Sequence, residues 1–365
     1  FFNGANLFLR VHGHEHRPCR VELLPPPGEG GTLWQVATSL ERDGAEQWRF
    51  GDYRADDYDD LIDHPVEMGV FDRIAFKVGG VPHWMVLSGR HRADLARLTL
   101  DLPRICAEHA ALFGGLPIDR YLFLTQVVGD GYGGLEHAFS TSLMVSRDDL
   151  PAPLPPATGD PDAGSVGVTL NPPEQPSQGY QRFLGLCSHE YFHLWNVKRI
   201  RPRAFIEQGL EREVHTRLLW WFEGVTSYYD DLALVRSGVI TPSAYLTMLA
   251  GVMTRVMRNP GRLLQSVAES SFDAWTKFYK QDENAPNAIV SYYAKGALVA
   301  LALDLHLRAE TRGSKTLDDL MRALWQRFGR SGTGVGERDV EALASELAGV
   351  DLGGFFQQAL DSTED

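Results

Sequence analysis

The chain is poor in cysteine, with three among its 365 residues. Cys19, Cys106 and Cys187 are far apart and form no CxxC pair. An odd and scattered set argues against a disulfide framework and against a zinc site built from cysteines. Cys187 lies two residues before His189, but its apolar flank, FLGLC, favours an inert thiol on a helix face over a nucleophile.

Long hydrophobic runs and an excess of positive charge are also absent. The longest apolar run, GALVALAL from Gly296, ends at Asp304 and is too short to cross a bilayer. Lysine and arginine number 35 against 48 aspartates and glutamates, which gives a net charge of −13. Such a chain attracts neither nucleic acid nor anionic membranes in bulk. We therefore expect a soluble protein, cytoplasmic or periplasmic, with no nucleic-acid partner and no membrane span.

Strand patterns come first along the chain and helical patterns follow. Residues 1–92 carry runs such as CRVELL, RIAFKVG and HWMVLS, which turn residues separate. From Ala93 apolar residues recur at helical spacing, with a break or kink expected at Pro103. A strand is expected at 121–128. This order predicts an α+β protein of several domains: a β domain at 1–92, a mixed domain at 93–255 and a helical domain at 256–365.

The second half of the chain is dominated by helical periodicity. Its candidate helices are 181–197, 213–236, 242–257, 291–310, 315–328 and 337–347. The proline-rich stretch 151–164 is expected to be a loop on composition alone.

The stretch SHEYFH at 188–193 indicates a metal site. His189 and His193 are four residues apart, so on a helix they share one face and can share one metal ion. Imidazole suits Zn²⁺, which in catalytic sites takes three protein ligands and a water. Glu190 would flank the metal, where a carboxylate can move a proton from bound water to a leaving amine. The alternative is a chance pair of histidines, but the apolar flanks predict a buried helix in which unsatisfied histidines would be costly.

A third ligand is needed, and Glu223 is the candidate. It is the single charged residue between Arg217 and Asp230, in LLWWFEGVTSYYDD. Two histidines and a glutamate form a known catalytic zinc set. The alternative is a structural salt bridge between Glu223 and Lys198 or Arg199.

These segments resemble the glycyl aminopeptidase family of zinc metallopeptidases, PDZ-containing relatives of aminopeptidase N with a thermolysin-like catalytic domain. SHEYFHLWNVKRIRP and LLWWFEGVTSYYDD carry the resemblance. Further similar stretches are DYDDLIDHPVEMG, LFGGLPIDRYLFL, GYGGLEH, QSVAESSFDAW and SYYAKGALVALALDLHLR. The family implies that residues 93–255 form the thermolysin-like zinc peptidase domain, between the N-terminal β domain and a C-terminal helical region. No PDZ domain is visible and the start looks cut, so we expect a trimmed or short form.

The resemblance also implies roles for single residues. His189, His193 and Glu223 would bind one Zn²⁺ ion per chain, and Glu190 would be the general base. Tyr293 in SYYAKG would donate to the oxyanion, with Tyr292 as the near alternative.

The segment GGLEH at 133–137 matches the position where relatives of aminopeptidase N recognise the substrate's amino group. Glu136 would then bind the free α-amino group of a peptide. Gly133 and Gly134 form a glycine turn before it, so that substrate backbone could pair along this strand edge. The alternative is a glutamate at a strand end in solvent.

The function implied by the resemblance is a zinc aminopeptidase that acts on peptides with a free N-terminus and a small first residue, glycine or alanine. Two alternatives stay open: a zinc endopeptidase with the same site, in which Glu136 does not anchor the terminus, and a catalytically silent peptide-binding protein. Glu190 argues against the silent protein, because a purely structural zinc site needs no carboxylate beside its ligands.

Overall fold

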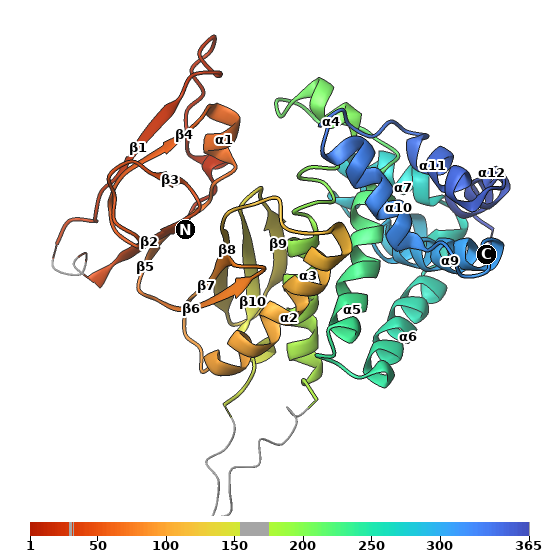
Figure 1. The fold of residues 1–365 in the computed structure, drawn as a ribbon, viewed down its shortest axis with the longest axis horizontal. Helices are drawn as coiled ribbons and strands as arrows, with labels where there is room; N and C mark the ends of the chain where they lie inside the picture. The colour runs from red at the N-terminus through yellow and green to blue at the C-terminus, as the bar shows by residue number, and fades with distance from the viewer. Residues whose placement is uncertain (29–30, 32, 154–174, 365) are drawn as a thin grey trace, which may run out of the picture. The chain divides into compact units, whose positions relative to one another are not determined.

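The computed structural model describes residues 1–28, 31, 33–153 and 175–364. Most of the loop expected at 151–164 therefore lies outside the described residues. The chain forms two compact units, one of residues 1–107 and 116–190 and one of residues 108–115 and 191–365. Strands come early and helices late along the chain (Figure 1), which confirms the predicted α+β class. The domain boundaries expected after residues 92 and 255 stay predictions.

The first unit begins with small antiparallel sheets. Strands β1 (Cys19–Leu23), β4 (Gly51–Ala55) and β3 (Glu41–Arg42) form one sheet, and β2 (Gln35–Thr38) pairs with β5 (Val66–Gly69). The short helix α1 (Tyr58–Ile62) follows β4. Leu23, Val36, Tyr53, Leu61 and Val66 are among the buried side chains that hold these elements together.

A five-stranded mixed sheet completes the strand part of this unit. Its order is β6 (Phe71–Val78), β7 (Val81–Ser88), β8 (Tyr121–Val128), β10 (Ser140–Ser146) and β9 (Tyr132–Glu136). Strands β7, β8 and β10 are parallel, whereas β9 pairs antiparallel with β10. Within the part of the chain that the structure describes, β9 is therefore an edge strand, with one side bonded to β10.

Two helices lie beside this sheet in Figure 1, α2 (Leu95–Phe113) and α3 (Gln178–Phe192). The Tyr180 hydroxyl at the start of α3 donates to the Asp101 carboxylate of α2 over 3.1 Å. The break expected at Pro103 is wrong, because α2 runs through this residue. Its buried face, which includes Leu98, Leu102 and Ile105, outweighs the hydrogen bond that proline removes.

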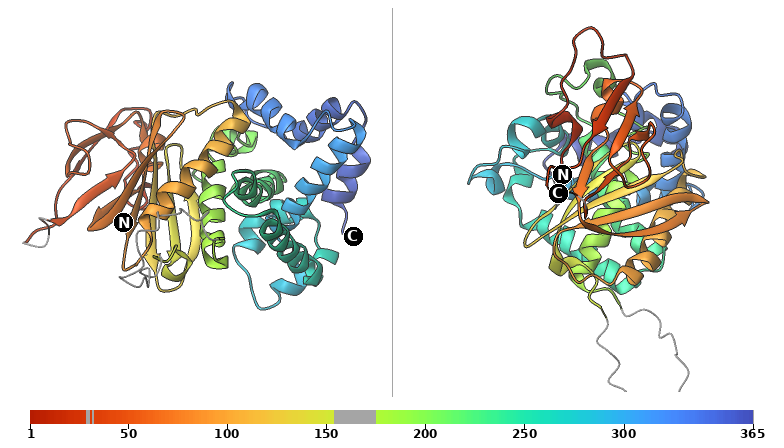
Figure 2. Two further views of the ribbon diagram at one scale, coloured as in Figure 1. Left: turned by 60° about the horizontal axis from the view of Figure 1, so that its bottom comes forward. Right: turned by 90° about the vertical axis from the view of Figure 1, so that its left-hand side faces the viewer.

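The second unit is built from helices around α9 (Ala294–Glu310), which contacts η4, α5, α6, α10 and α11. Figure 2 shows these helices, coloured green to blue, packed on one another. The elements after α3 are α4 (Arg203–Gln208), the π-helix η4 (Trp220–Val225), α5 (Thr226–Arg236), α6 (Pro242–Arg258), η5 (Pro260–Leu263), α7 (Val267–Phe272), the π-helix η6 (Ala274–Phe278), α8 (Ala285–Ala288), α9, α10 (Leu317–Leu324), the π-helix η7 (Trp325–Gly329), α11 (Asp339–Ala348), α12 (Gly353–Phe356) and the π-helix η8 (Gln357–Asp361). No described helix is long and apolar enough to cross a membrane.

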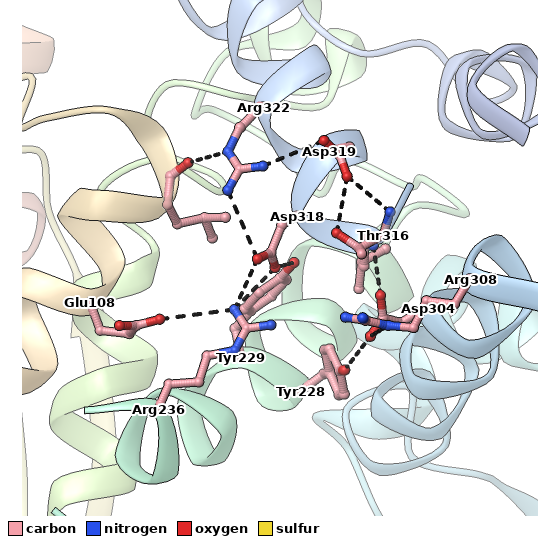
Figure 3. Close-up of polar contacts among 12 residues, drawn as sticks. Glu108, Tyr228, Tyr229, Arg236, Asp304, Arg308, Thr316, Asp318, Asp319 and Arg322 are labelled. Atoms are coloured by element: carbon pink, nitrogen blue, oxygen red, sulfur yellow. Dashed lines mark hydrogen bonds and ion pairs between the residues drawn. The ribbon is translucent and has the colours of Figure 1, made fainter. Parts of the chain in front are cut away.

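A polar network ties α5, α9 and α10 together inside the second unit (Figure 3). The buried Asp304 carboxylate accepts from the Tyr228 hydroxyl at 3.0 Å, the Arg308 guanidinium at 3.1 Å and the Leu317 amide at 2.7 Å. Nearby, Asp318 accepts from Tyr229 at 2.8 Å. Buried carboxylates are tolerable when they are paired and hydrogen-bonded in this way. The network therefore fixes how α5, which begins three residues after Glu223, lies against α9.

Candidate active site

The end of α3 presents the two histidines of the HEYFH segment. His189 lies in the last turn of the helix, and His193 follows its last residue and is 1% exposed. The His193 Nδ1 atom lies 2.8 Å from the backbone oxygen of Asn196. With Nδ1 donating to this carbonyl, Nε2 is the nitrogen that remains for a metal ion.

Glu223 approaches the histidines from the π-helix η4. Its Oε2 atom lies 3.3 Å from the Nε2 atom of His193. One ligand atom from each of His189, His193 and Glu223 lies within 4.8 Å of the other two. Two imidazole nitrogens and one carboxylate oxygen are a donor set that suits zinc and that leaves a fourth position open. This part of the chain could therefore hold a catalytic metal ion.

Asn196 connects the two segments that carry His193 and Glu223. This residue is fully buried, and its side-chain Nδ2 donates to the backbone oxygens of Trp221 at 3.2 Å and Phe222 at 3.4 Å, and lies 3.1 Å from Thr226 Oγ1. One residue thus binds the His193 ring through its backbone and the η4 backbone through its side chain. The sequence analysis missed Asn196; its place three residues after the second histidine, in HLWN, was the available signal.

The backbones of η4 and α9 touch at two glycines. A Cβ atom added to Gly224 would lie 2.6 Å from the Cα atom of Gly296, and one added to Gly296 would lie 3.0 Å from the Cα atom of Gly224. Because neither residue has a side chain, Glu223 and the first turn of α9 can come close together. This contact positions Tyr293, which is the N-cap residue of α9.

Tyr293 belongs to a cluster of three tyrosine hydroxyls. Its hydroxyl lies 3.3 Å from that of Tyr279, to which the Tyr292 hydroxyl donates over 3.2 Å. Burial raises the pKa of Tyr293 well above its usual range, and the negative charge of Glu223 raises it further. The phenol is therefore protonated at physiological pH and can donate a hydrogen bond. Tyr292 is fully buried, and Tyr279, which is 61% exposed, was not anticipated from the sequence.

Glu190 lies against strand β9 in the first unit. A Cβ atom on Gly134 would lie 2.1 Å from Glu190 Oε1, whereas one on Gly133 would meet nothing within 4 Å. Gly134 therefore makes room for the Glu190 carboxylate. A carboxylate oxygen of Glu136 lies within 4.8 Å of one of Glu190, and Glu190 Oε2 accepts from Thr141 Oγ1 at 3.5 Å. GGLEH thus faces the general-base candidate.

The Cys187 thiol is not a nucleophile. It is 2% exposed, and burial raises the pKa of its thiol well above the usual range. A thiol of this kind stays protonated and inert, as the sequence predicts.

Two family models match separate parts of the chain. The M61 glycyl aminopeptidase model matches residues 182–299, and the peptidase M61 N-terminal domain model matches residues 1–70. Together they match more than half of the 365 residues. No protein of curated function matches the chain in sequence.

Solved structures match all or nearly all of the chain. An aminopeptidase N family protein from Idiomarina loihiensis is 44% identical with a TM-score of 0.90, covering 100% of this chain and 59% of its own length. An M1 zinc metallopeptidase from Deinococcus radiodurans is 15% identical with a TM-score of 0.58, covering 98% of this chain and 67% of its own. Native yeast LTA4 hydrolase is 13% identical with a TM-score of 0.57, and the match covers 95% of this chain and 46% of the hydrolase. These comparisons agree with the predicted fold, an N-terminal β domain followed by a helical domain of the thermolysin-like type.

Proposed function

Because the chain belongs to the M61 glycyl aminopeptidase family, we propose that it is a zinc-dependent aminopeptidase. Its substrates would be peptides with a free N-terminus and a small first residue, glycine or alanine. The observation that carries this proposal is the convergence of His189, His193 and Glu223, beside a glutamate that directly follows the first histidine. The chain spans 59% of the length of its 44%-identical relative, so the activity is proposed for the catalytic part that is present here.

His189 and His193 would hold one Zn²⁺ ion through their ring nitrogens and Glu223 through a carboxylate oxygen. When bound, this ion would supply Lewis-acid polarisation of the scissile carbonyl and an acidified water. The Glu190 carboxylate, open to β9 across Gly134, would accept the proton of the attacking water and deliver it to the leaving amine.

Tyr293 would donate its phenolic proton to the oxygen on which negative charge develops. Its raised pKa supports this role, because a neutral phenol is a donor throughout the working pH range. Tyr292, whose hydroxyl donates to Tyr279, would support the cluster from a buried position instead of touching substrate.

Glu136 would bind the substrate's ammonium group and so limit cleavage to the first peptide bond. Among the described residues β9 is the last strand of its sheet, so the backbone of a short peptide could pair along it, beside the Glu190 carboxylate at Gly134. Glu136 is partly exposed, as a binding carboxylate must be. This arrangement favours the aminopeptidase over an endopeptidase with the same metal ligands.

The test uses one short peptide that begins with glycine, free and N-acetylated. Zinc-loaded wild type and the Glu190→Gln variant are incubated with each peptide, the products are identified by mass spectrometry, and zinc content is measured in both proteins. We expect the wild type to remove glycine from the free peptide alone, and the variant to bind zinc without cleaving.

Internal cleavage of both peptides would make the protein an endopeptidase and would remove the proposed role of Glu136. Zinc binding without cleavage of any peptide would favour the silent peptide-binding protein.

A further inference from the structure

The segment DYDDLIDHP in the N-terminal region has no part in the chemistry described so far. It forms α1, with an aspartate at each end. Asp57 is the N-cap residue, and its carboxylate accepts from the Asp60 amide at 2.8 Å. Asp63 is the C-cap residue, and its carboxylate leaves the helix for another partner.

The partner of Asp63 is the turn that joins β9 to β10. Asp63 Oδ1 lies 3.0 Å from His137 Nδ1, and Asp63 Oδ2 accepts from the backbone N–H of Ala138 at 2.8 Å. The His137 side chain is 4% exposed and that of Asp63 23%. One carboxylate therefore holds two consecutive residues of the turn, in a site largely removed from water, where such hydrogen bonds are strongest.

The same turn is held at its next residue, Phe139. The ring of His64, which follows Asp63, stacks on Phe139 with 6.1 Å between centroids and 17° between planes. The Arg120 guanidinium lies over the Phe139 ring, 5.3 Å from its centroid. Three successive turn residues are thus held by contacts from outside their own hairpin.

The turn begins one residue after Glu136. Within the hairpin, the His137 amide donates to the Ser140 oxygen at 2.9 Å, and Glu136 is paired with Thr141. A movement of the turn would therefore shift Glu136, which is the last residue of β9 and is joined directly to the turn. Because Glu136 and Glu190 have carboxylate oxygens within 4.8 Å of each other, such a shift would change the distance between them directly.

We propose that Asp63 is a positioning residue, which holds the β9–β10 turn so that Glu136 meets the ammonium group of the substrate. The inference rests on the proposed aminopeptidase function and deepens it. It assigns the N-terminal β region a role in substrate binding, through a carboxylate that binds the turn after Glu136.

The test compares Asp63→Ala with Asp57→Ala, which removes the carboxylate at the other end of the same helix. Kinetics are measured with a free peptide that begins with glycine, and hydrogen exchange is followed at the amides of residues 137–140. Asp63→Ala should raise KM about tenfold, lower kcat less than about threefold, and speed exchange at the turn. Asp57→Ala should change thermal stability but neither KM nor exchange at the turn.

Asp63→Asn provides the conservative rescue, because its side-chain oxygen can still accept from the Ala138 amide. We expect its KM to lie between those of wild type and Asp63→Ala, and it keeps the test available should the alanine variant fold poorly. The inference is overturned if Asp63→Ala and Asp57→Ala have the same KM, or if exchange at the turn is unchanged.

The exchange measurement requires no substrate and so separates this inference from the proposed function. If the wild type cleaves free and acetylated peptides equally, Glu136 is not an ammonium site, and the proposed function fails at that step. Exchange at the turn then decides whether Asp63 holds it: faster exchange supports the positioning role, and unchanged exchange rejects it.

Discussion

Gly224 and Gly296 lie backbone to backbone. Gly224 directly follows the proposed zinc ligand Glu223, and Gly296 lies in the first turn of α9, whose N-cap residue is Tyr293. A Cβ atom on Gly224 would lie 2.6 Å from the Cα atom of Gly296 and 2.7 Å from the backbone carbonyl oxygen of Tyr292. All of these atoms belong to backbone, so none can turn away as a flexible side chain would. Gly224 has helical geometry, so this requirement comes from space and not from its φ angle.

The substitution Gly224→Ala should therefore separate η4 from α9. We expect it to lower the free energy of unfolding by about 1–3 kcal/mol and to weaken zinc binding, because Glu223 moves with the backbone. Urea denaturation and zinc titration measure the two effects. The matched control is Gly251→Ala in α6, where the added Cβ meets nothing within 4 Å and should stabilise the helix by about 0.5–1 kcal/mol. Equal stability of the two variants would contradict the prediction.

The two glycines of GGLEH should respond differently to alanine. In Gly134→Ala the methyl group would overlap the Glu190 carboxylate, whereas in Gly133→Ala it would enter open space. We expect Gly134→Ala to reduce kcat about a hundredfold, because a general base displaced by about 1 Å is poorly aligned. Gly133→Ala should keep kcat within about threefold, since it leaves Glu190 in place. Zinc content should stay normal in both variants. Similar kcat values in the two variants would show that Gly134 is not required to position the Glu190 carboxylate.

Asn196 should control zinc affinity without being a ligand. Asn196→Ala removes the hydrogen bonds from Nδ2 to the backbone oxygens of Trp221 and Phe222, although the Phe222 oxygen keeps its bond from the Thr226 hydroxyl at 2.6 Å. We expect stability to fall by about 1–3 kcal/mol and zinc affinity to fall about 10- to 100-fold. Chelator competition measures the affinity. Asn287→Ala, at an exposed asparagine, is the control. A variant that is destabilised but binds zinc with wild-type affinity would reduce Asn196 to a structural role.

Acid should destabilise the protein through its buried histidines. Burial lowers the pKa of His109 to about 3, with a further contribution from the positive charge of Arg236, and burial lowers the pKa of His83 to about 4. Both folded-state values lie below the unfolded value of about 6.5. Between pH 6.5 and the folded-state pKa, the unfolded chain binds protons that the folded chain does not, so stability falls as pH falls.

At pH 5 the loss should be roughly 2 kcal/mol per histidine relative to pH 8. The variant His109→Phe should unfold with a shallower dependence on pH across this window, as measured by urea denaturation at several pH values. His14→Gln, at an exposed position, serves as the control and should keep the wild-type dependence. An unchanged acid slope in His109→Phe would mean that His109 binds protons in the folded state too.

Local patterns predicted much of the fold. The helical periodicity of residues 291–310 and 242–257 indicated α9 and α6, and the strand-like runs RIAFKVG and HWMVLS indicated β6 and β7. The break expected at Pro103 was wrong, because a local rule does not include the burial of Leu98 and Leu102 on the same helix. The candidate helix at 213–236 begins as the π-helix η4 at Trp220, and periodicity does not reveal that extra residue per turn.

For the site, the sequence by itself determined only the features that depend on residues close together in the chain. The spacing of His189 and His193 places them one helical turn apart, and Glu190 follows the first of them whatever the rest of the chain does. Only the tertiary structure decided the remaining relationships: the 3.3 Å approach of Glu223 to His193, the contact of Gly224 with Gly296 and the hold of Asp63 on Ala138. These pairs are separated by many residues, and their meeting depends on how buried surfaces pack, which no short-range pattern contains.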